Sequence, residues 1–129
     1  MTDLVNNGNN VFLPAVFITE RNHIVRHVSH LPQDVDTRKG LPIASGVLDY
    51  FPDAIIALAE VSRKGNDQHS PGKPLHWDRS KSGDESDALM RHFMDRGTLD
   101  TDGVRHSAKV AWRALALLQK EIEKEKEHD

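Results

Sequence analysis

Acidic side chains in the middle of the chain have a spacing that can hold a divalent cation. Asp84 and Asp87 are three positions apart, and a helix places residues at this spacing on one face. Glu60 precedes them on a stretch with its own helical periodicity. Carboxylate oxygens are the ligands that Mg²⁺ and Mn²⁺ prefer. Glu60, Asp84 and Asp87 are therefore the candidate metal-binding and catalytic residues, and Mg²⁺ (or Mn²⁺) is the candidate cofactor.

The same carboxylates also have simpler interpretations. Acidic residues in a first helical turn are favoured by the helix dipole, which accounts for Asp84 and Asp87 without a metal. Glu60 and Lys64 are four positions apart and can form an exposed ion pair on one helix. Periodicity alone favours this ion pair for Glu60, so the metal hypothesis depends on the groups between the two helices.

The segment between these helices, from Gly65 to Gly83, is interpreted as a long polar loop. Long loops without periodicity are uncommon in compact domains, where they are functional or disordered. A Trp, two His and two Pro-anchored turns in this segment are not typical of disorder. We interpret the segment as an active or binding loop. The alternative is an ordered structural loop pinned by Leu75 and Trp77.

Cationic groups that face a metal held by carboxylates are what phosphoryl chemistry on a nucleotide requires. In this hypothesis Lys and Arg side chains contact phosphates, Asn66 and His69 position the nucleotide, and Trp77 borders the base or is part of the core. The candidate nucleotide-binding residues are Lys64, Asn66, His69, His76, Trp77, Arg79, Lys81, Arg91, His92, His106, Lys109 and Arg113.

Helical segments must position these groups, and the sequence predicts their limits. The first helix is expected over 52–64, with Pro at its first position and Gly65-Asn66 as its stop. The second is expected over 83–95, because Ser82 and Glu85 have the spacing of a capping box. The third is expected from Gly103 to near Lys126.

The last helix carries two patterns. Apolar side chains recur at the 4-3-4-3-4 spacing of a heptad seam, at Val104, Ala108, Ala111, Leu115, Leu118 and Ile122. This helix is more apolar than a monomer of 129 residues needs, so we expect a homo-oligomer (dimer or tetramer). His106, Lys109 and Arg113 form a basic stripe that suits phosphates; the alternative is a solvated face.

The N-terminal part is expected to differ from the rest. Residues 1–36 are interpreted as an arm with a possible β-hairpin, formed by the runs 11–18 and 24–29. Residues 30–46 are predicted to be a connector, and 37–129 the helical domain. The predicted fold class is therefore mainly α, a compact three-helix core with a short N-terminal β-hairpin-like extension.

Composition narrows the function classes. The net charge of −3 argues against broad binding of duplex nucleic acid, and a small nucleotide is the expected partner. No apolar run has the length of a membrane helix and no leader pattern begins the chain, so we expect no membrane partner and a cytoplasmic location. The absence of Cys excludes disulfides and thiolate metal ligands.

The central sequence resembles a known family. The run GNDQHSPGKPLHWDRSKSGDESDALMRH, with TRKGLPIASGVLDYFPDAIIALAEVS before it and GTLDTDGVRHSAKVAWRALALLQKE after it, is similar to the phage and bacterial family named for the N-terminal domain of dATP/dGTP diphosphohydrolase. The resemblance covers roughly residues 37–121. It implies hydrolysis of a deoxypurine triphosphate to the monophosphate and pyrophosphate, in phage nucleotide-pool control and thus in the host cytoplasm. It also implies similarity to the MazG-like all-α pyrophosphohydrolases, which are Mg²⁺-dependent helical oligomers.

The match to the MazG-like metal motif is partial. That motif places Glu-x-x-Glu on one helix and Glu-x-x-Asp on the next. Asp84 and Asp87 resemble the second element with one substitution, whereas Glu60 is followed at the corresponding spacing by Arg63. The alternative function is therefore a non-catalytic nucleotide-binding oligomer, such as a phage protein that sequesters a host signalling nucleotide. A helical interaction module is a third alternative.

Overall fold

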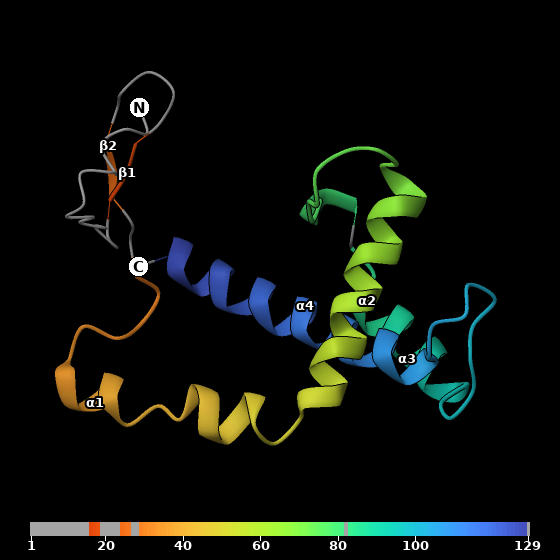
Figure 1. The fold of residues 1–129 in the computed structure, drawn as a ribbon, viewed down its shortest axis with the longest axis horizontal. Helices are drawn as coiled ribbons and strands as arrows, with labels where there is room; N and C mark the ends of the chain where they lie inside the picture. Colours follow the sequence, from red (N-terminus) through yellow and green to blue (C-terminus); the bar gives the residue numbers. More distant parts are fainter. Residues whose placement is uncertain (1–15, 19–23, 27–28, 82, 129) are drawn as a thin grey trace, which may run out of the picture. The chain divides into compact units, whose positions relative to one another are not determined.

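A computed structural model describes residues 16–18, 24–26, 29–81 and 83–128 (Figure 1). The chain divides into two compact units, Met1–Pro42 and Ile43–Asp129. The candidate site residues all belong to the second unit. Most of the described residues are helical, so the prediction of a mainly α chain is confirmed.

The first unit contains two short strands and one short helix. Strands β1 (Val16–Ile18) and β2 (Ile24–Arg26) are antiparallel. They fall inside the two runs predicted to form a hairpin, and the rest of these runs, except Ser29, lies outside the described residues. Helix α1 (Val35–Lys39) begins after Asp34, whose carboxylate accepts hydrogen bonds from the Thr37 amide at 2.9 Å and the Thr37 hydroxyl at 2.7 Å. The predicted connector thus contains a capped helical turn.

The second unit is built around its last helix. The π-helical turn η2 (Ala44–Leu48) leads into α2 (Pro52–His69), and the 3₁₀ turn η3 (Arg79–Lys81) precedes α3 (Glu85–Met94). Helices α2 and α3 both pack against α4 (His106–Glu127), drawn in blue in Figure 1. The three predicted helices are present, with different ends.

Helix α2 does not stop at Gly65, as predicted, but continues to His69. A Gly inside a helix costs only about 1 kcal/mol relative to Ala, which tertiary contacts can offset. Here the side chain of buried Asn66 donates to the carbonyl of Lys73 at 3.0 Å, which ties the last turn to the following loop. The Ser70 amide then closes the helix on the Asn66 carbonyl at 2.7 Å. The predicted binding loop therefore begins near Ser70.

Helix α3 begins at Glu85 rather than at 83 and ends at Met94. Asp84 precedes it without a side-chain capping bond, because its carboxylate accepts from Arg91 at 2.9 Å. Ser82, the first half of the predicted capping box, lies outside the described residues.

The turn between α3 and α4, residues 95–105, is a tight reversal held by backbone bonds. Leu99 and Arg105 form an antiparallel bridge, and the Asp100 amide donates to the Val104 carbonyl at 2.8 Å. Gly97 and Gly103 have φ angles of 85° and 83°, which glycine adopts without steric cost. Because of this turn, α4 begins at His106 rather than at the predicted Gly103.

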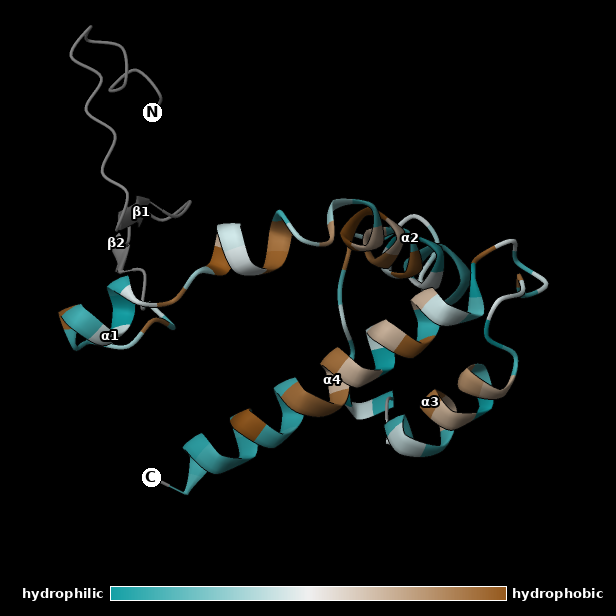
Figure 2. Cartoon of the chain, turned by 90° about the horizontal axis from the view of Figure 1, so that it is seen from below, coloured by the Kyte–Doolittle hydropathy of each residue, from teal (hydrophilic) through white to brown (hydrophobic). Residues whose placement is uncertain are grey.

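The apolar core among the described residues is small. Its buried hydrophobic members are Ala88, Val104, Ala108 and Ala116. The predicted heptad seam of α4 is thus divided, since Leu115 and Leu118 are 52% and 51% exposed. Figure 2 shows hydrophobic segments alternating with hydrophilic ones along α4, whose C-terminal end is hydrophilic.

No single helix in the described part of the chain combines the length and the apolar composition needed to cross a membrane. The segments Val35–Leu48 and Pro52–His69 reach that threshold only when they are taken together as a bent pair. Core helices of soluble proteins reach it as well.

Candidate functional site

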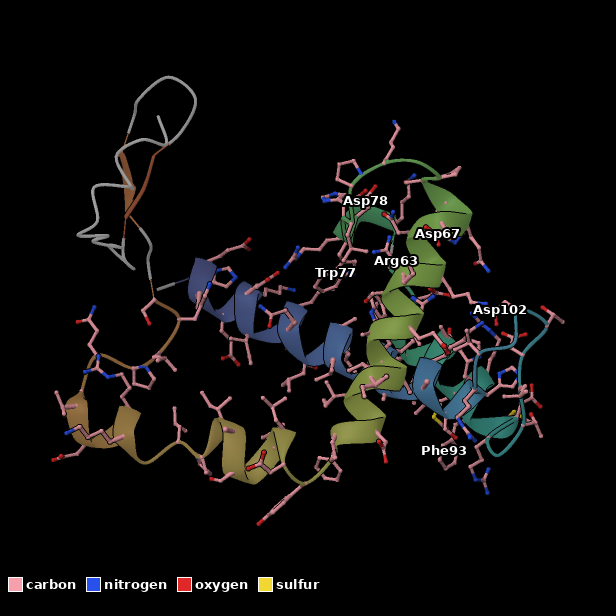
Figure 3. All side chains as sticks on the ribbon, viewed as in Figure 1. Arg63, Asp67, Trp77, Asp78, Phe93 and Asp102 are labelled. Carbon is pink, nitrogen blue, oxygen red and sulfur yellow. The ribbon has the colours of Figure 1, made fainter. Side chains whose placement is uncertain are left out.

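A cavity of about 590 Å³ lies beside the C-terminal half of α2, the loop after it, and α4. Its volume is in the range of small-molecule sites, roughly 300–1,000 Å³. Figure 3 labels Trp77, Asp78 and Asp102, which belong to its wall. The predicted nucleotide-binding residues that line the cavity are Asn66, His69, His76, Trp77, Lys81, His92, Lys109 and Arg113.

Two polar atoms in the cavity wall are buried without a hydrogen-bond partner. They are Oδ1 of Asn66, a residue that is only 7% exposed, and Nε1 of Trp77. Burying an unpaired polar atom is costly, and such atoms are rare in folded proteins. One of them is a hydrogen-bond acceptor and the other a donor. Asn66 and Trp77, two residues of the cavity wall, therefore each carry a buried polar atom whose hydrogen bond is unmet among the described residues.

Trp77 is half-buried in the cavity wall, and its predicted contact with a base stays a prediction. Its ring meets Trp112 edge to face, with centroids 5.6 Å apart, and Trp112 donates to the Ser62 hydroxyl at 3.1 Å. The Arg79 guanidinium lies 4.1 Å from the centroid of the Trp77 ring. Arg79 is held there by two hydrogen bonds of 2.8 Å to Glu123. These contacts fix the orientation of the Trp77 ring.

Lys109 is a cation of the cavity that two carboxylates anchor. Its ammonium is 2.6 Å from Asp100 Oδ2 and 2.9 Å from Asp102 Oδ2, and its side chain is 18% exposed. Burial alone would lower the pKa of Lys109, but the hydrogen bonds to the two carboxylates outweigh it and the pKa is raised. The hydrogen bond from Lys109 is also the main reason why the pKa of Asp100 falls to about 2.

The basic stripe of α4 faces inward. Arg113 is 29% exposed in its side chain and is 3.3 Å from Glu85, and both Lys109 and Arg113 line the cavity. The interpretation of this stripe as a solvated face is therefore wrong. His106 does not line the cavity but contacts His92, with 3.0 Å between their Nδ1 atoms.

Three predicted phosphate-binding cations lie outside the cavity wall. Lys64 donates to the Asp102 carbonyl at 2.9 Å, Arg79 is paired with Glu123, and Arg91 is paired with Asp84 at 2.9 Å. Since Lys64 reaches the turn instead, the alternative of a Glu60–Lys64 ion pair is not observed among the described residues.

The predicted metal ligands are spread over two helices. Glu60 is exposed on α2, Asp87 is exposed on α3, and Asp84 is engaged by Arg91. Within the described residues the group with ligand spacing is a different one, His92, Asp100 and His106. The assignment of a metal to Glu60, Asp84 and Asp87 stays a prediction.

Asp100 and Asp102 were not among the predicted site residues. The available signal was two Asp on a short turn between Gly97 and Gly103, with Lys109 one to two turns into the next helix. Asp and Gly are also common in turns that have no functional role. Only the close approach of α2, through Lys64 and a Gln68 hydrogen bond of 3.3 Å, shows that it belongs to the site.

Comparison with known proteins supports the resemblance. The family model described as dATP/dGTP diphosphohydrolase, N-terminal, matches residues 32–129. The chain belongs to this family, which relates it to diphosphohydrolases of dATP and dGTP. No curated protein and no solved structure matched the chain.

Proposed function

We propose that this protein is a metal-dependent pyrophosphohydrolase of deoxypurine nucleoside triphosphates, active in nucleotide-pool control in the host cytoplasm of a phage. Water would attack the α-phosphorus, and the bond between the α-phosphorus and the oxygen that bridges it to the β-phosphorus would break. The products are the monophosphate and pyrophosphate. The observation that carries the proposal is the cavity with its two unpaired buried atoms, in a chain of the dATP/dGTP diphosphohydrolase N-terminal family.

The unpaired atoms suit a purine base. Adenine offers an N–H donor at N6 and an acceptor at N7 on the same edge. These groups complement the Asn66 Oδ1 acceptor and the Trp77 Nε1 donor. Guanine also carries N–H donors beside ring and carbonyl acceptors, so a purine of either kind can pair both atoms. A ligand without a donor would leave Asn66 Oδ1 unsatisfied, so the two atoms favour a nucleobase over a ligand that lacks these groups. Pyrimidines also carry a donor and an acceptor, so the choice of a purine rests on the family.

Cations of the same cavity suit the phosphates. Lys81 lines it from the loop, while Lys109 and Arg113 line it from α4. Lys81 is only loosely paired, 4.0 Å from Asp78, and is mostly exposed, so it can turn toward an anion. Charge-assisted hydrogen bonds from Lys and Arg are the usual means of holding phosphate oxygens.

The metal belongs to this proposal through Glu60, Asp84 and Asp87. Their oxygen donors suit Mg²⁺ or Mn²⁺, which when bound neutralises phosphate oxygens and activates water. Among the described residues of the single chain, however, Glu60, Asp84 and Asp87 do not form a group close enough together to bind one ion, and Asp84 is paired with Arg91. They do not assemble a metal centre by themselves.

The separation of Glu60, Asp84 and Asp87 in the described chain favours a second candidate function. A protein that binds a nucleotide without cleaving it needs the cavity but no assembled metal centre. Arg63 stands where MazG-like enzymes carry a second acid on the first helix. A phage protein that sequesters a signalling nucleotide of its host has this requirement.

We also propose that the protein is a homo-oligomer joined through α4. Leu115, Leu118 and Ile122 remain exposed on this helix, whereas the buried hydrophobic residues of the described unit are mostly alanines. Exposed apolar patches of this kind are typical of interaction surfaces.

Product analysis tests both functions. The purified chain is incubated with each dNTP and NTP in Mg²⁺ or Mn²⁺ or EDTA, and the products are resolved by ion-exchange chromatography. We expect monophosphate and pyrophosphate from dATP or dGTP, with metal only. Asp87→Asn should abolish turnover, while the exposed Asp67→Asn, outside the cavity wall, should leave it unchanged.

Intact nucleotides in every reaction would refute the enzyme. Equilibrium dialysis with the same nucleotides then decides the second function, which requires purine nucleotide binding that persists in EDTA. An absence of both turnover and binding would refute both functions.

A further inference from the structure

Two imidazoles and a carboxylate converge where α3, the 95–105 turn and α4 meet. His92 comes from α3, Asp100 from the turn, and His106 is the first residue of α4. One potential ligand atom from each lies within 4.8 Å of the others. We propose that His92, Asp100 and His106 bind one divalent transition-metal ion, with at least one coordination position left open for water or an oxygen ligand.

The spacing of the two imidazoles fits a common metal ion. Their Nδ1 atoms are 3.0 Å apart. Two nitrogen ligands at about 2.0–2.1 Å from a tetrahedral Zn²⁺ would be about 3.3 Å apart. The rings therefore need only a small displacement to admit an ion between them and the carboxylate.

The donor set selects the class of ion. Imidazole nitrogens bind Zn²⁺, Co²⁺, Ni²⁺ and related ions well, whereas Mg²⁺ prefers an all-oxygen shell. Two His and one carboxylate are a ligand set found in zinc sites that keep an open position. This site is thus chemically distinct from the predicted all-oxygen set of Glu60, Asp84 and Asp87.

The local fold holds the ligands in place before any ion arrives. The His106 amide donates to the Thr98 carbonyl at 3.1 Å, and the Asp100 amide donates to the Val104 carbonyl at 2.8 Å. These backbone bonds fix where the turn and the first residue of α4 present their side chains.

Lys109 is the group that opposes the ion. Its ammonium donates to Asp100 Oδ2 at 2.6 Å, so it shares the carboxylate with the metal and repels the cation. The second bond of Lys109, to Asp102 at 2.9 Å, keeps the ammonium anchored if Asp100 turns to the ion. Lys109 thus both orients Asp100 and weakens binding, and its removal should tighten metal binding.

The site does not depend on nucleotide hydrolysis, so its test uses the metal alone. A chain without a histidine tag is stripped of metal with a chelator and titrated with Co²⁺, and visible absorption is recorded. We expect one Co²⁺ per chain, with the strong d–d bands of a four- or five-coordinate ion, and displacement by Zn²⁺ but not by excess Mg²⁺. Zn²⁺ should also raise the thermal unfolding midpoint.

Variants assign the ligands. His106→Asn and Asp100→Asn should each weaken Co²⁺ binding by at least about tenfold and remove the bands. His30→Asn and His128→Asn change exposed histidines elsewhere in the chain and should leave the titration unaltered. Circular dichroism establishes that each variant is folded.

Lys109→Met keeps the ligands and removes the competing charge, so it should bind Co²⁺ more tightly than the parent chain does. Equal binding by the parent, His106→Asn and Asp100→Asn would overturn the proposal, as would the absence of saturable binding in the parent. If the ligand variants do not fold, weaker binding in a folded Lys109→Met overturns it and tighter binding upholds it. Failure of this test leaves pyrophosphate release from dATP or dGTP untouched, so the two proposals fail separately.

Discussion

Glu85 should be one of the residues on which the stability of the second unit most depends. It is 5% exposed at the start of α3, and its carboxylate is 3.3 Å from Arg113 and 2.9 Å from Lys120. Both cations belong to α4, so the carboxylate joins the two helices. We predict that Glu85→Gln, which keeps the shape and removes the charge, lowers the free energy of unfolding substantially.

The magnitude follows from burial. Breaking a fully buried ion pair by removing one partner costs about 3–5 kcal/mol. Here the side chains of Arg113 and Lys120 are 29% and 26% exposed, so water can solvate them after the change. Two charged hydrogen bonds are worth about 3–6 kcal/mol together, and the amide of the variant keeps neutral hydrogen bonds of about 1 kcal/mol each, so we expect a loss of about 2–3 kcal/mol. For a chain of 129 residues this is a decrease in Tm of roughly 6–12 °C.

Urea unfolding followed by circular dichroism measures this change, with Glu121→Gln on the exposed side of α4 as the matched control. A double-mutant cycle with Lys120→Met isolates the pair, and its coupling energy should exceed about 0.5 kcal/mol. A loss no larger than that of Glu121→Gln would refute the reasoning, because it would mean that the three charges contribute nothing net.

Three further predictions follow from other contacts. Asn66→Ala removes the unpaired acceptor and the hydrogen bond to Lys73, so purine nucleotide binding measured by calorimetry should weaken at least about tenfold; unchanged affinity would exclude Asn66 as a base contact. The hydrogen bond from Lys109 lowers the folded-state pKa of Asp100 to about 2, so in metal-free protein its stabilisation is complete above the unfolded pKa of about 3.9 and is lost as pH falls toward 2. Unfolding midpoints between these pH values should fall in the parent and change less in Lys109→Met, and parallel curves would contradict this origin. Leu118→Ser should shift the mass measured by light scattering toward the monomer, and an unchanged mass would remove Leu118 from the interface.

The sequence is informative about the helices and less so about their ends. Apolar periodicity located all three helices of the second unit, because packing against α4 imposes that period. The end of α2 was wrong by about one turn because a side-chain hydrogen bond from Asn66 to Lys73 outweighs the helix-stopping tendency of Gly65. Tertiary bonds of this kind leave no local signal in the sequence.

The residues that line the cavity were also only partly predictable from the sequence. Residue types identified eight of its lining residues, since Lys, Arg, His and Trp in one loop and one helix face are unusual together. Spacing did not show that the basic stripe of α4 faces the 95–105 turn, because helix periodicity gives a face but not its partner. Asp102, which lines the cavity, was missed for that reason, although it contacts Lys109 at 2.9 Å.

The charges around the cavity support metal dependence in the proposed reaction. Lys109 is shared by two carboxylates, and Arg113 and Lys120 share Glu85. Much of the positive charge at the cavity is thus already balanced by the fold. A nucleoside triphosphate brings several negative charges into this partly neutralised wall, and desolvating them without a counter-charge is expensive. Nucleotide that arrives with its own divalent cation brings part of this counter-charge, so the proposed reaction requires less of the already paired Lys109 and Arg113.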